Sequence, residues 1–267
     1  IAQGDTSEVG LGQLLEAGWT VHRAISSTQW PGGESLEISK VWMTREVEWT
    51  VDSVLDGREV PAGIDRMLYR CARSGWEKQR LSENSDQSFI GSYVLGMGFT
   101  MSPEEAAELI KRDPRNRDVL FPYLGGEDLN QSPTHEAPRW IINFFDWDEA
   151  KARTYPDCFA IIEERVKPER QERKPNGDFK KRKPLPQKYW IYAEKRPALY
   201  RTIKPLATVL AISRVSRTVM PVRVPTGQVL SEATVVFAYD DDFHLGVLSS
   251  TFHARWVVRY SSSMRTD

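Results

Sequence analysis

Two carboxylates and a lysine form the pattern in this chain that comes nearest to catalysis. Asp157 follows Pro156, and Glu172 and Lys174 flank Arg173 further along the chain. In metal-dependent nucleases, such carboxylates hold a divalent cation and the lysine orients water. The pattern is permissive, however, in a chain in which 27% of the residues are charged. Asp157 also stands at the start of a predicted helix, where a carboxylate stabilises the helix dipole. A nuclease centre at these residues is therefore kept as an alternative.

Other catalytic signatures are missing from the sequence. Gly96 and Gly98 lack the third glycine and the following helix of a nucleotide-binding or methyl-donor-binding turn. There is no Asn-Pro-Pro-aromatic motif, with which amino-methyltransferases hold a flipped base, and no Gly-Lys-Ser/Thr loop. His244 and His253 fall on opposite faces of a predicted helix, and the two cysteines lack partners for a zinc site. We expect no catalytic residue, metal or cofactor in this chain.

Positive charge is concentrated in the second half of the chain. Residues 1–164 contain 16 Lys or Arg against 28 Asp or Glu, and residues 165–267 contain 20 against 9, so that the net charge is −1. Residues 165–201 alone contain 13 basic and 4 acidic residues. This asymmetry favours a polyanion as the partner of the second half, although a solvated basic loop would have the same composition.

The basic stretch has the composition of a nucleic-acid contact, because Lys and Arg neutralise phosphates and supply affinity. Aromatic residues lie among the basic ones, namely Phe179, Tyr189, Trp190 and Tyr192. The alternative interpretation is a surface of ordinary salt bridges. The predicted contacts to the DNA backbone are Lys167, Arg170, Arg173, Lys174, Lys180, Lys181, Arg182, Lys183 and Lys188.

A second arginine-bearing segment, Ser213–Thr218, joins two predicted strands and contains Arg214 and Arg217. Arginine is the side chain best suited to bidentate contact with guanine in the major groove. This loop is therefore a candidate for base readout.

Helices and strands must position these residues, and their sequence patterns predict an α+β protein with mixed or antiparallel sheets and flanking helices. Ser102 should cap a helix beginning at Pro103, with Glu105 closing a capping box, and Asp146 should cap a short helix over 147–153. A single helix from residue 242 should place Leu245, Leu248, Phe252 and Trp256 on one face. Strands are expected at 19–25, 36–42, 140–145, 209–212, 220–224 and 234–238.

The chain has no membrane or export signal that we can identify. No apolar run approaches the roughly 20 residues that span a bilayer, and the first residues lack the regions of a signal peptide. Two cysteines form no disulfide framework, so we expect a cytoplasmic protein. Because the chain begins with Ile1 and stops at Asp267 without a terminating signal, we expect a piece of a longer protein.

Several motifs, in order, resemble the latter part of fused restriction–modification enzymes of the Type IIG or MmeI-like kind and of related adenine-specific DNA methyltransferases. Together they cover about residues 91–267, and residues 1–6 resemble the segment that follows the family's catalytic domain. The motifs are FPYLGGEDLN (121–130), RWIINF (139–144), Tyr155-Pro156, VKPER (166–170), Trp190-Ile191-Tyr192, Arg196-Pro197, SRVS (213–216) and Leu248-Ser249-Ser250 followed by Trp256.

The resemblance implies that residues 91–267 form a DNA target-recognition domain that ends before the family's closing motifs. Residues 1–90 would be a linker or β-rich region that follows a methyltransferase domain absent from this chain. That domain would bind S-adenosylmethionine and catalyse methylation. The expected partners are therefore double-stranded DNA and the parent's methyltransferase domain, in the bacterial cytoplasm. The parent would be a site-specific adenine methyltransferase, with or without endonuclease activity.

The resemblance also implies which segments read bases: the loop after the Arg-Val-Ser motif, the strand turn that follows, and the segment after the last helix. With Arg214, the implied residues are Ser216, Arg217 and Thr218; Ser231, Glu232 and Ala233; and Ser262, Ser263 and Arg265. Two alternatives stay open, the nuclease centre and a non-catalytic protein-interaction module. Magnesium-dependent cleavage would favour the first, and the absence of DNA binding at low salt the second.

Overall fold

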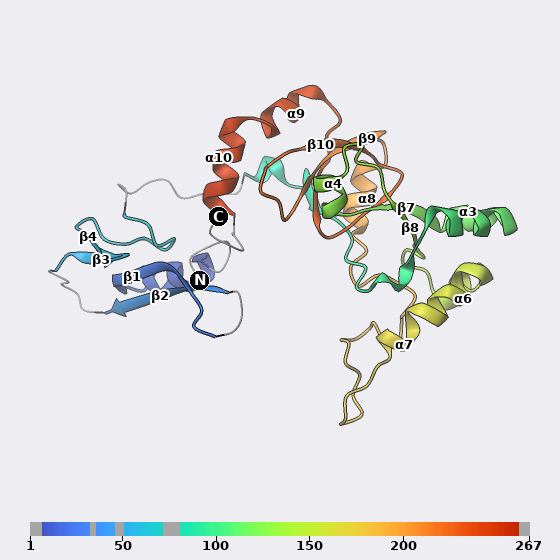
Figure 1. The fold of residues 1–267 in the computed structure, drawn as a ribbon, viewed down its shortest axis with the longest axis horizontal. Coiled ribbons are helices and arrows are strands. Elements are labelled where there is room, and N and C mark those ends of the chain that lie inside the picture. Colours follow the sequence, from blue (N-terminus) through green and yellow to red (C-terminus); the bar gives the residue numbers. More distant parts are fainter. Residues whose placement is uncertain (1–6, 33–35, 46–50, 72–80, 262–267) are drawn as a thin grey trace. The chain divides into compact units, whose positions relative to one another are not determined.

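The structure is a computed structural model that describes residues 7–32, 36–45, 51–71 and 81–261. The chain divides into two compact units, one formed by residues 1–79 with 255–267 and the other by residues 80–254. Strands and helices occur together in the molecule (Figure 1), which confirms the predicted α+β class with flanking helices. Within the described ranges, no helix has both the length and the apolar character needed to cross a bilayer.

The first unit is built around a four-stranded sheet with the order β2-β1-β3-β4. Its elements are η1 (Ser7–Gly12), α2 (Gln13–Glu16), β1 (Thr20–Gln29), β2 (Glu37–Thr44), β3 (Ser53–Leu55) and β4 (Arg58–Val60). Strand β1 pairs antiparallel with β2 and parallel with β3, so the two strands predicted from period-two patterns are confirmed as neighbours. Asp56 and Gly57 form the β3–β4 turn at φ of 51° and 78°, the positive-φ conformation that Asp-Gly favours.

The second unit contains two four-stranded sheets, which we call the upper sheet (β10-β9-β12-β5) and the lower sheet (β11-β7-β8-β6). Most of their pairings are antiparallel, and β11 pairs parallel with β7. The strands are β5 (Ser88–Ile90), β6 (Thr100–Met101), β7 (Leu120–Leu124), β8 (Arg139–Ile142), β9 (Thr208–Ser213), β10 (Val222–Pro225), β11 (Val229–Leu230) and β12 (Thr234–Phe237).

Helices and short turns precede, connect and follow these strands, and the residues of the last helix from 255 onward belong to the first unit. They are η2 (Ser82–Asn84), η3 (Met97–Phe99), α3 (Pro103–Arg112), η4 (Pro114–Asp118), α4 (Gly126–Gln131), α5 (Glu149–Ala152), α6 (Pro156–Arg165), α7 (Lys167–Arg170), α8 (Pro197–Ile203), α9 (Asp242–Leu248) and α10 (Thr251–Tyr260). Ser102 caps α3 as predicted, because its Oγ accepts from the backbone N of Glu105 at 3.2 Å. The Glu105 carboxylate pairs with Arg165 at 2.6 Å, which replaces its predicted return bond to the cap.

Two predicted helices differ from the structure. Asp148, not Asp146, caps the short helix α5, because Phe145 takes a φ of 52° and delays the helix start, while Asp146 pairs with Lys195. The predicted single helix from residue 242 is broken into α9 and α10, since Ser250 Oγ accepts from the backbone N of His253 and starts a new helix. Phe252 is consequently 89% exposed.

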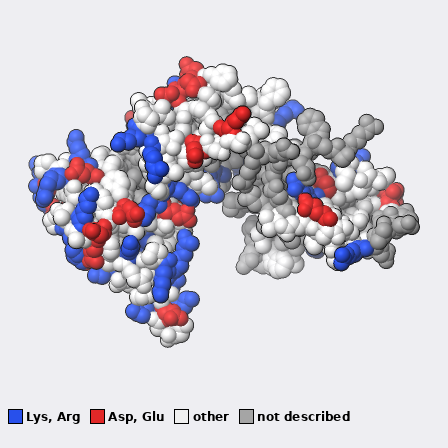
Figure 2. Space-filling model, turned by 180° about the vertical axis from the view of Figure 1, so that it is seen from behind, with Lys and Arg blue, Asp and Glu red and all other residues white. Residues whose placement is uncertain are grey.

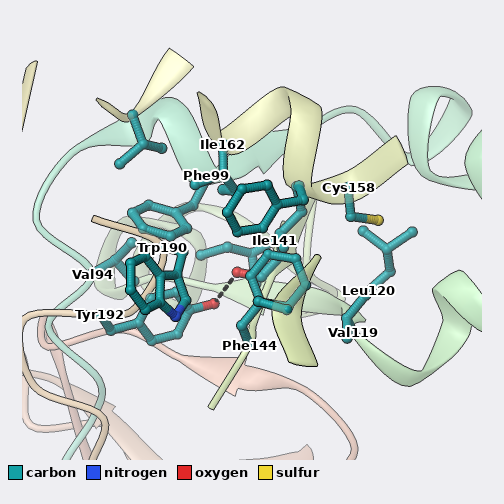
Figure 3. Close-up of a cluster of buried hydrophobic side chains, with 14 of the residues drawn as sticks. Val94, Phe99, Val119, Leu120, Ile141, Phe144, Cys158, Ile162, Trp190 and Tyr192 are labelled. Carbon is teal, nitrogen blue, oxygen red and sulfur yellow. Dashed lines mark hydrogen bonds between the residues drawn. The ribbon is translucent and has the colours of Figure 1, made fainter. Parts of the chain in front are cut away.

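The core of the lower sheet is aromatic (Figure 3). Phe99 and Tyr192 meet edge to face at 5.3 Å between ring centroids, a geometry that the ring quadrupoles favour. Tyr192 is fully buried, so its hydroxyl needs a partner, and it donates to the carbonyl of Ile142 at 2.7 Å. Trp190 Nε1 likewise donates to the carbonyl of Trp147 at 2.9 Å. These bonds fix segment 189–192 against β8 and the segment that follows it.

The chain passes between the two sheets at two places that touch each other. Residues 88–101 run from β5 of the upper sheet to β6 of the lower sheet, and residues 229–237 run from β11 of the lower sheet to β12 of the upper. Where the two segments meet, the backbone N of Ser92 donates to the carbonyl of Leu230 at 2.7 Å and the backbone N of Glu232 donates to that of Ser92 at 2.9 Å. We call this meeting point the sheet crossing.

The sheet crossing leaves no room for a side chain at Gly91. A Cβ there would lie 2.1 Å from the carbonyl oxygen of Ser231 and 2.5 Å from that of Leu230. Both obstacles are backbone atoms that are held in hydrogen-bonded segments, so they cannot move aside locally.

We therefore expect Gly91→Ala to lower the free energy of unfolding by roughly 1–3 kcal/mol, as overpacking does. Gly227→Ala is the matched control, because a Cβ at Gly227 would meet nothing within 4 Å, and it should stay within about 0.5 kcal/mol of the parent chain. Urea unfolding of residues 1–267 measures both. Equal midpoints for the two variants would contradict the close approach.

Candidate nucleic-acid interface

Two of the three segments expected to read bases meet at one end of the upper sheet. Ser213, the last residue of β9, is paired with Thr234, the first residue of β12. The loop after β9 (residues 214–219, loop 214–219) therefore lies beside the turn before β12 (residues 231–233, turn 231–233). The backbone N of Arg214 donates to the carbonyl of Ala233 at 2.8 Å, and Arg214 Nη1 donates to that of Glu232 at 2.9 Å. The structure thus joins segments that are distant in sequence.

Loop 214–219 presents its polar side chains to solvent. Arg214, Ser216, Arg217 and Thr218 are all exposed. Ser216 Oγ accepts from the backbone N of Thr218 at 3.2 Å, a local turn that bends the loop at its tip. Exposed arginine and hydroxyl groups on a bent loop can reach base edges, since both are suited to direct readout.

Turn 231–233 is more buried than the sequence suggests, and Ser231 needs a correction. Ser231 is 4% exposed, its Oγ accepts from the backbone N of Ala233 at 3.2 Å, and its carbonyl accepts from Thr234 Oγ1 at 2.8 Å. Its hydroxyl is therefore used inside the sheet crossing, which contradicts the predicted base contact. Ala233 is exposed and stays a prediction.

Glu232 occupies an unusual environment beside Tyr123. In the described part of the chain, Glu232 Oε2 is buried and makes no hydrogen bond. Burial, followed by the negative charge of Glu232, raises the pKa of the Tyr123 phenol to about 12. Tyr123 therefore keeps its proton at neutral pH. A buried carboxylate oxygen without a donor is rare and marks a position that a bound partner can complete.

A helix that the sequence reasoning missed lies against both segments. A Cβ at Gly126 would lie 2.5 Å from the carbonyl oxygen of Ala233 and 2.8 Å from Ser213 Oγ, so α4 begins in direct contact with turn 231–233 and the end of β9. Asp128 Oδ2 accepts from the backbone N of Gly125 at 2.7 Å and pairs with Arg139 at 2.9 Å. In the sequence, the pair Gly125-Gly126 before an acidic residue was the signal that could have indicated this close approach of the helix.

The third segment expected to read bases, with Ser262, Ser263 and Arg265, lies outside the described residues.

The basic stretch after α7 forms a hairpin that we call the basic hairpin (residues 171–183). The backbone N of Lys180 donates to the carbonyl of Glu172 at 2.8 Å, and Gly177 turns the chain at a φ of 88°. The preceding Asn176 makes the Asn-Gly pair typical of such turns. The hairpin projects beyond α7, and Lys and Arg side chains follow the projecting lobe (Figures 1 and 2).

Part of the charge on the basic hairpin is neutralised by neighbouring acidic groups. Lys180 pairs with Glu172, Lys181 with Glu169 at 2.9 Å, and Arg182 with Glu194 at 3.7 Å. At the base of the region Lys167 pairs with Glu163 at 3.3 Å, and Arg173 lies over the Phe179 ring at 4.1 Å. The exposed residues of the set without an ion-pair partner among the described residues are Arg173, Lys174, Lys183 and Lys188.

The predicted contact of Arg170 with the DNA backbone is the second one that the structure corrects. Its side chain is fully buried, and its Nη2 donates to the carbonyls of Val94 at 2.7 Å and Leu95 at 3.0 Å. Burial lowers the pKa of this guanidinium. A side chain enclosed in this way cannot reach a phosphate, so Arg170 is a structural residue that joins α7 to segment 94–99.

The aromatic residues near the basic hairpin are also mostly structural. Tyr189, Trp190 and Tyr192 are buried in the core of the lower sheet, which excludes them as exposed stacking platforms. Phe179 is half-buried beneath Arg173. Basic and aromatic residues are therefore close in the sequence because a buried core segment follows a surface hairpin.

The residues of the nuclease alternative are not brought together. Asp157 lies at the start of α6 and pairs with Arg112 of α3 at 3.2 Å, while Glu172 and Lys174 lie in the basic hairpin beyond α7, where Glu172 pairs with Lys180. Among the residues that the structure describes, no group of three His, Cys, Asp or Glu side chains could hold a metal ion. The three residues form no common site.

Comparisons with known proteins show the family and the fold of the chain. The family model for the target recognition domain of MmeI matches residues 77–267. Among solved structures, the chain is similar to the Type IIL restriction–modification enzyme MmeI in complex with DNA, with a TM-score of 0.68 and 15% sequence identity. The similarity covers 100% of this chain and 36% of that chain, so this chain spans little more than a third of that enzyme's length. A comparison with curated proteins gave no match.

The structural role of Arg170 gives a prediction. Arg170→Met should lower the free energy of unfolding by roughly 1.5–3 kcal/mol, because hydrogen bonds from a charged donor to buried carbonyls are lost. Arg173→Met, on the exposed surface of the basic hairpin, should change it by less than about 1 kcal/mol. Denaturant unfolding of the chain tests the pair. Arg170 would return to the DNA-contact set if its variant were as stable as the Arg173 variant.

Proposed function

The chain belongs to the family of MmeI target recognition domains, and from this premise we propose that it recognises a specific sequence of double-stranded DNA on behalf of a longer restriction–modification protein. The observation that carries the proposal is the pairing of β9 with β12, which places loop 214–219 beside turn 231–233. Loop 214–219 offers donors and acceptors suited to base edges in the major groove. Within turn 231–233, Glu232 offers an acceptor.

The basic hairpin supplies the sequence-independent part of the affinity in this proposal. Lys174, Lys183 and Lys188 bind phosphates directly, while Lys180, Lys181 and Arg182 exchange their present acidic partners for phosphates at little cost, because exposed ion pairs contribute little. Phosphate contacts fix the orientation of a protein on the duplex, whereas base contacts specify the sequence. In this proposal the basic hairpin therefore supplies affinity, and loop 214–219 with turn 231–233 supplies specificity.

The chemistry belongs to the rest of the parent protein. We assign methylation of a target adenine to a methyltransferase domain elsewhere in the parent, which binds S-adenosylmethionine as methyl donor when loaded. No residue of this chain is assigned to that cofactor. Residues 91–267 place the adenine for flipping, and residues 1–90, which are rich in acidic groups, connect to the catalytic domain. The parent acts in the bacterial cytoplasm, with or without cleavage of DNA.

The role of the basic hairpin in phosphate binding predicts how the affinity for DNA depends on salt concentration. Binding of the full-length protein to duplex DNA should weaken as salt rises, and Lys174→Ala, Lys183→Ala and Lys188→Ala together should reduce the slope of log K against log salt by about 0.9 per lost contact. A control with Lys111→Ala and Arg117→Ala, exposed residues outside the hairpin, should keep the slope. Fluorescence anisotropy at several salt concentrations measures it. Absence of DNA binding even at low salt would favour the protein-interaction module instead.

Loop 214–219 makes a prediction about site choice. Cells that express the full-length protein should carry methyladenine in one short motif, and Arg217→Glu should abolish or change that motif, because a base contact worth about 1–3 kcal/mol is replaced by a repulsive charge. Arg117→Glu, an equally exposed reversal away from the loop, should leave the motif unchanged. Single-molecule sequencing of cellular DNA reads out both. The loop assignment is wrong if Arg217→Glu modifies the same sites at the same rate.

A further inference from the structure

Helix α4 is connected to loop 214–219 by one side chain, Asn130. Asn130 Nδ2 donates to the carbonyl of Val215 at 2.9 Å and to Ser213 Oγ at 3.3 Å. Ser213 Oγ in turn donates to the same carbonyl of Val215 at 2.9 Å. A primary amide has two protons to donate, so one Asn side chain can hold both positions. The carbonyl of Val215 therefore receives two hydrogen bonds at the point where the loop leaves the sheet.

The helix that carries Asn130 has a fixed place. Gly126 and Asn130 are four residues apart and share one face of α4, and the missing side chain at Gly126 lets this face contact Ala233 and Ser213 directly. Leu129 of the same helix is 7% exposed and packs in the core of the upper sheet. Asn130 thus projects from a helix that is itself held in place, which is what precise placement of a neighbouring loop requires.

The residues beyond Val215 need such support. The side chains of Val215, Ser216 and Thr218 are exposed, and Val215 is 64% exposed, so burial of these three side chains does not hold this part of the loop. The backbone direction at Val215 sets where Arg217, two residues on, can reach. By holding the backbone at Val215 before DNA binds, the bonds from Asn130 reduce the part of the loop that must be ordered on binding, which favours affinity and discrimination.

We propose that Asn130 is a positioning residue for sequence recognition: its amide holds the carbonyl of Val215 so that Arg217 and its neighbours meet only the correct base pairs. This inference rests on the proposed function, because it assigns a role within DNA recognition. Asn130 touches no base in this proposal. It acts on specificity by limiting the conformations of loop 214–219, since a loop that can adapt its backbone also adapts to the wrong base.

The chain offers a closely matched test. Asn130→Asp keeps the shape of the side chain but removes both donors and places a carboxylate against the carbonyl of Val215. Gln131→Glu makes the same chemical change at the next residue, whose amide donates to Glu127 within the helix at 3.1 Å. The full-length protein is measured for affinity toward duplexes selected from a random library and toward duplexes with single base-pair changes. Unfolding midpoints are measured in parallel.

We expect Asn130→Asp to lower the ratio of affinities for the selected site over its single-change neighbours by roughly threefold to tenfold, the size of one lost hydrogen bond. Gln131→Glu should stay within about twofold. Ser213→Ala removes the other donor to the Val215 carbonyl without adding charge, and it should also lower the ratio. If this ratio of affinities falls while the unfolding midpoint stays unchanged, the result supports the role of Asn130 as a positioning residue.

The opposite outcomes are distinct. The inference is overturned, with the proposed function intact, if the parent protein discriminates but Asn130→Asp and Ser213→Ala keep the parent's ratio. It is equally overturned if Asn130→Asp weakens binding to all duplexes by the same factor, because that result indicates a general structural role. If the parent protein itself binds all duplexes equally, the proposed function fails and the inference fails with it.

Discussion

The second unit depends on the close approach of two backbone segments at the sheet crossing. Ser231 lies on one segment, where its backbone N donates to the carbonyl of Leu124 at 3.0 Å, and Gly91 lies on the other, where only a hydrogen atom fits. Because each segment passes from one sheet to the other, the crossing connects the two cores. Turn 231–233 is part of it, so this turn is held in place by the fold itself.

Features with a local signal were predictable from the sequence. The Ser102 cap, the strands at 208–213 and 234–237 and the overall α+β class follow from residue type and spacing over a few positions, and the structure confirms them. Local signals misplaced the cap at Asp146 and merged α9 with α10, because a positive φ at Phe145 and a hydroxyl at Ser250 act on single residues inside an otherwise helical pattern. Helix ends are decided by such individual bonds.

Features that depend on distant partners were not predictable. Arg170 looks like its basic neighbours in the sequence, yet it bonds to carbonyls about 75 residues upstream, and no local pattern marks that burial. Ser231 was likewise expected to contact bases, and no local pattern marks its burial at the sheet crossing. The position of loop 214–219 between two strands was predictable, whereas its support by Asn130, 85 residues before Val215, requires the fold. Charge composition indicated the candidate interface, and geometry separates the structural residues of that segment from its exposed ones.

The sheet crossing also limits how this surface can evolve. Turn 231–233 is held at both ends by strands of different sheets, so an inserted or deleted residue would shift the register of β11 or β12. Its length is therefore fixed, whereas an exposed side chain such as that of Ala233 can be exchanged. Loop 214–219 joins two strands of a single sheet and faces solvent, where length changes are tolerated. Divergence among relatives should therefore proceed by substitution at one segment and by insertion or deletion at the other, which gives the family two independent routes to new target sites.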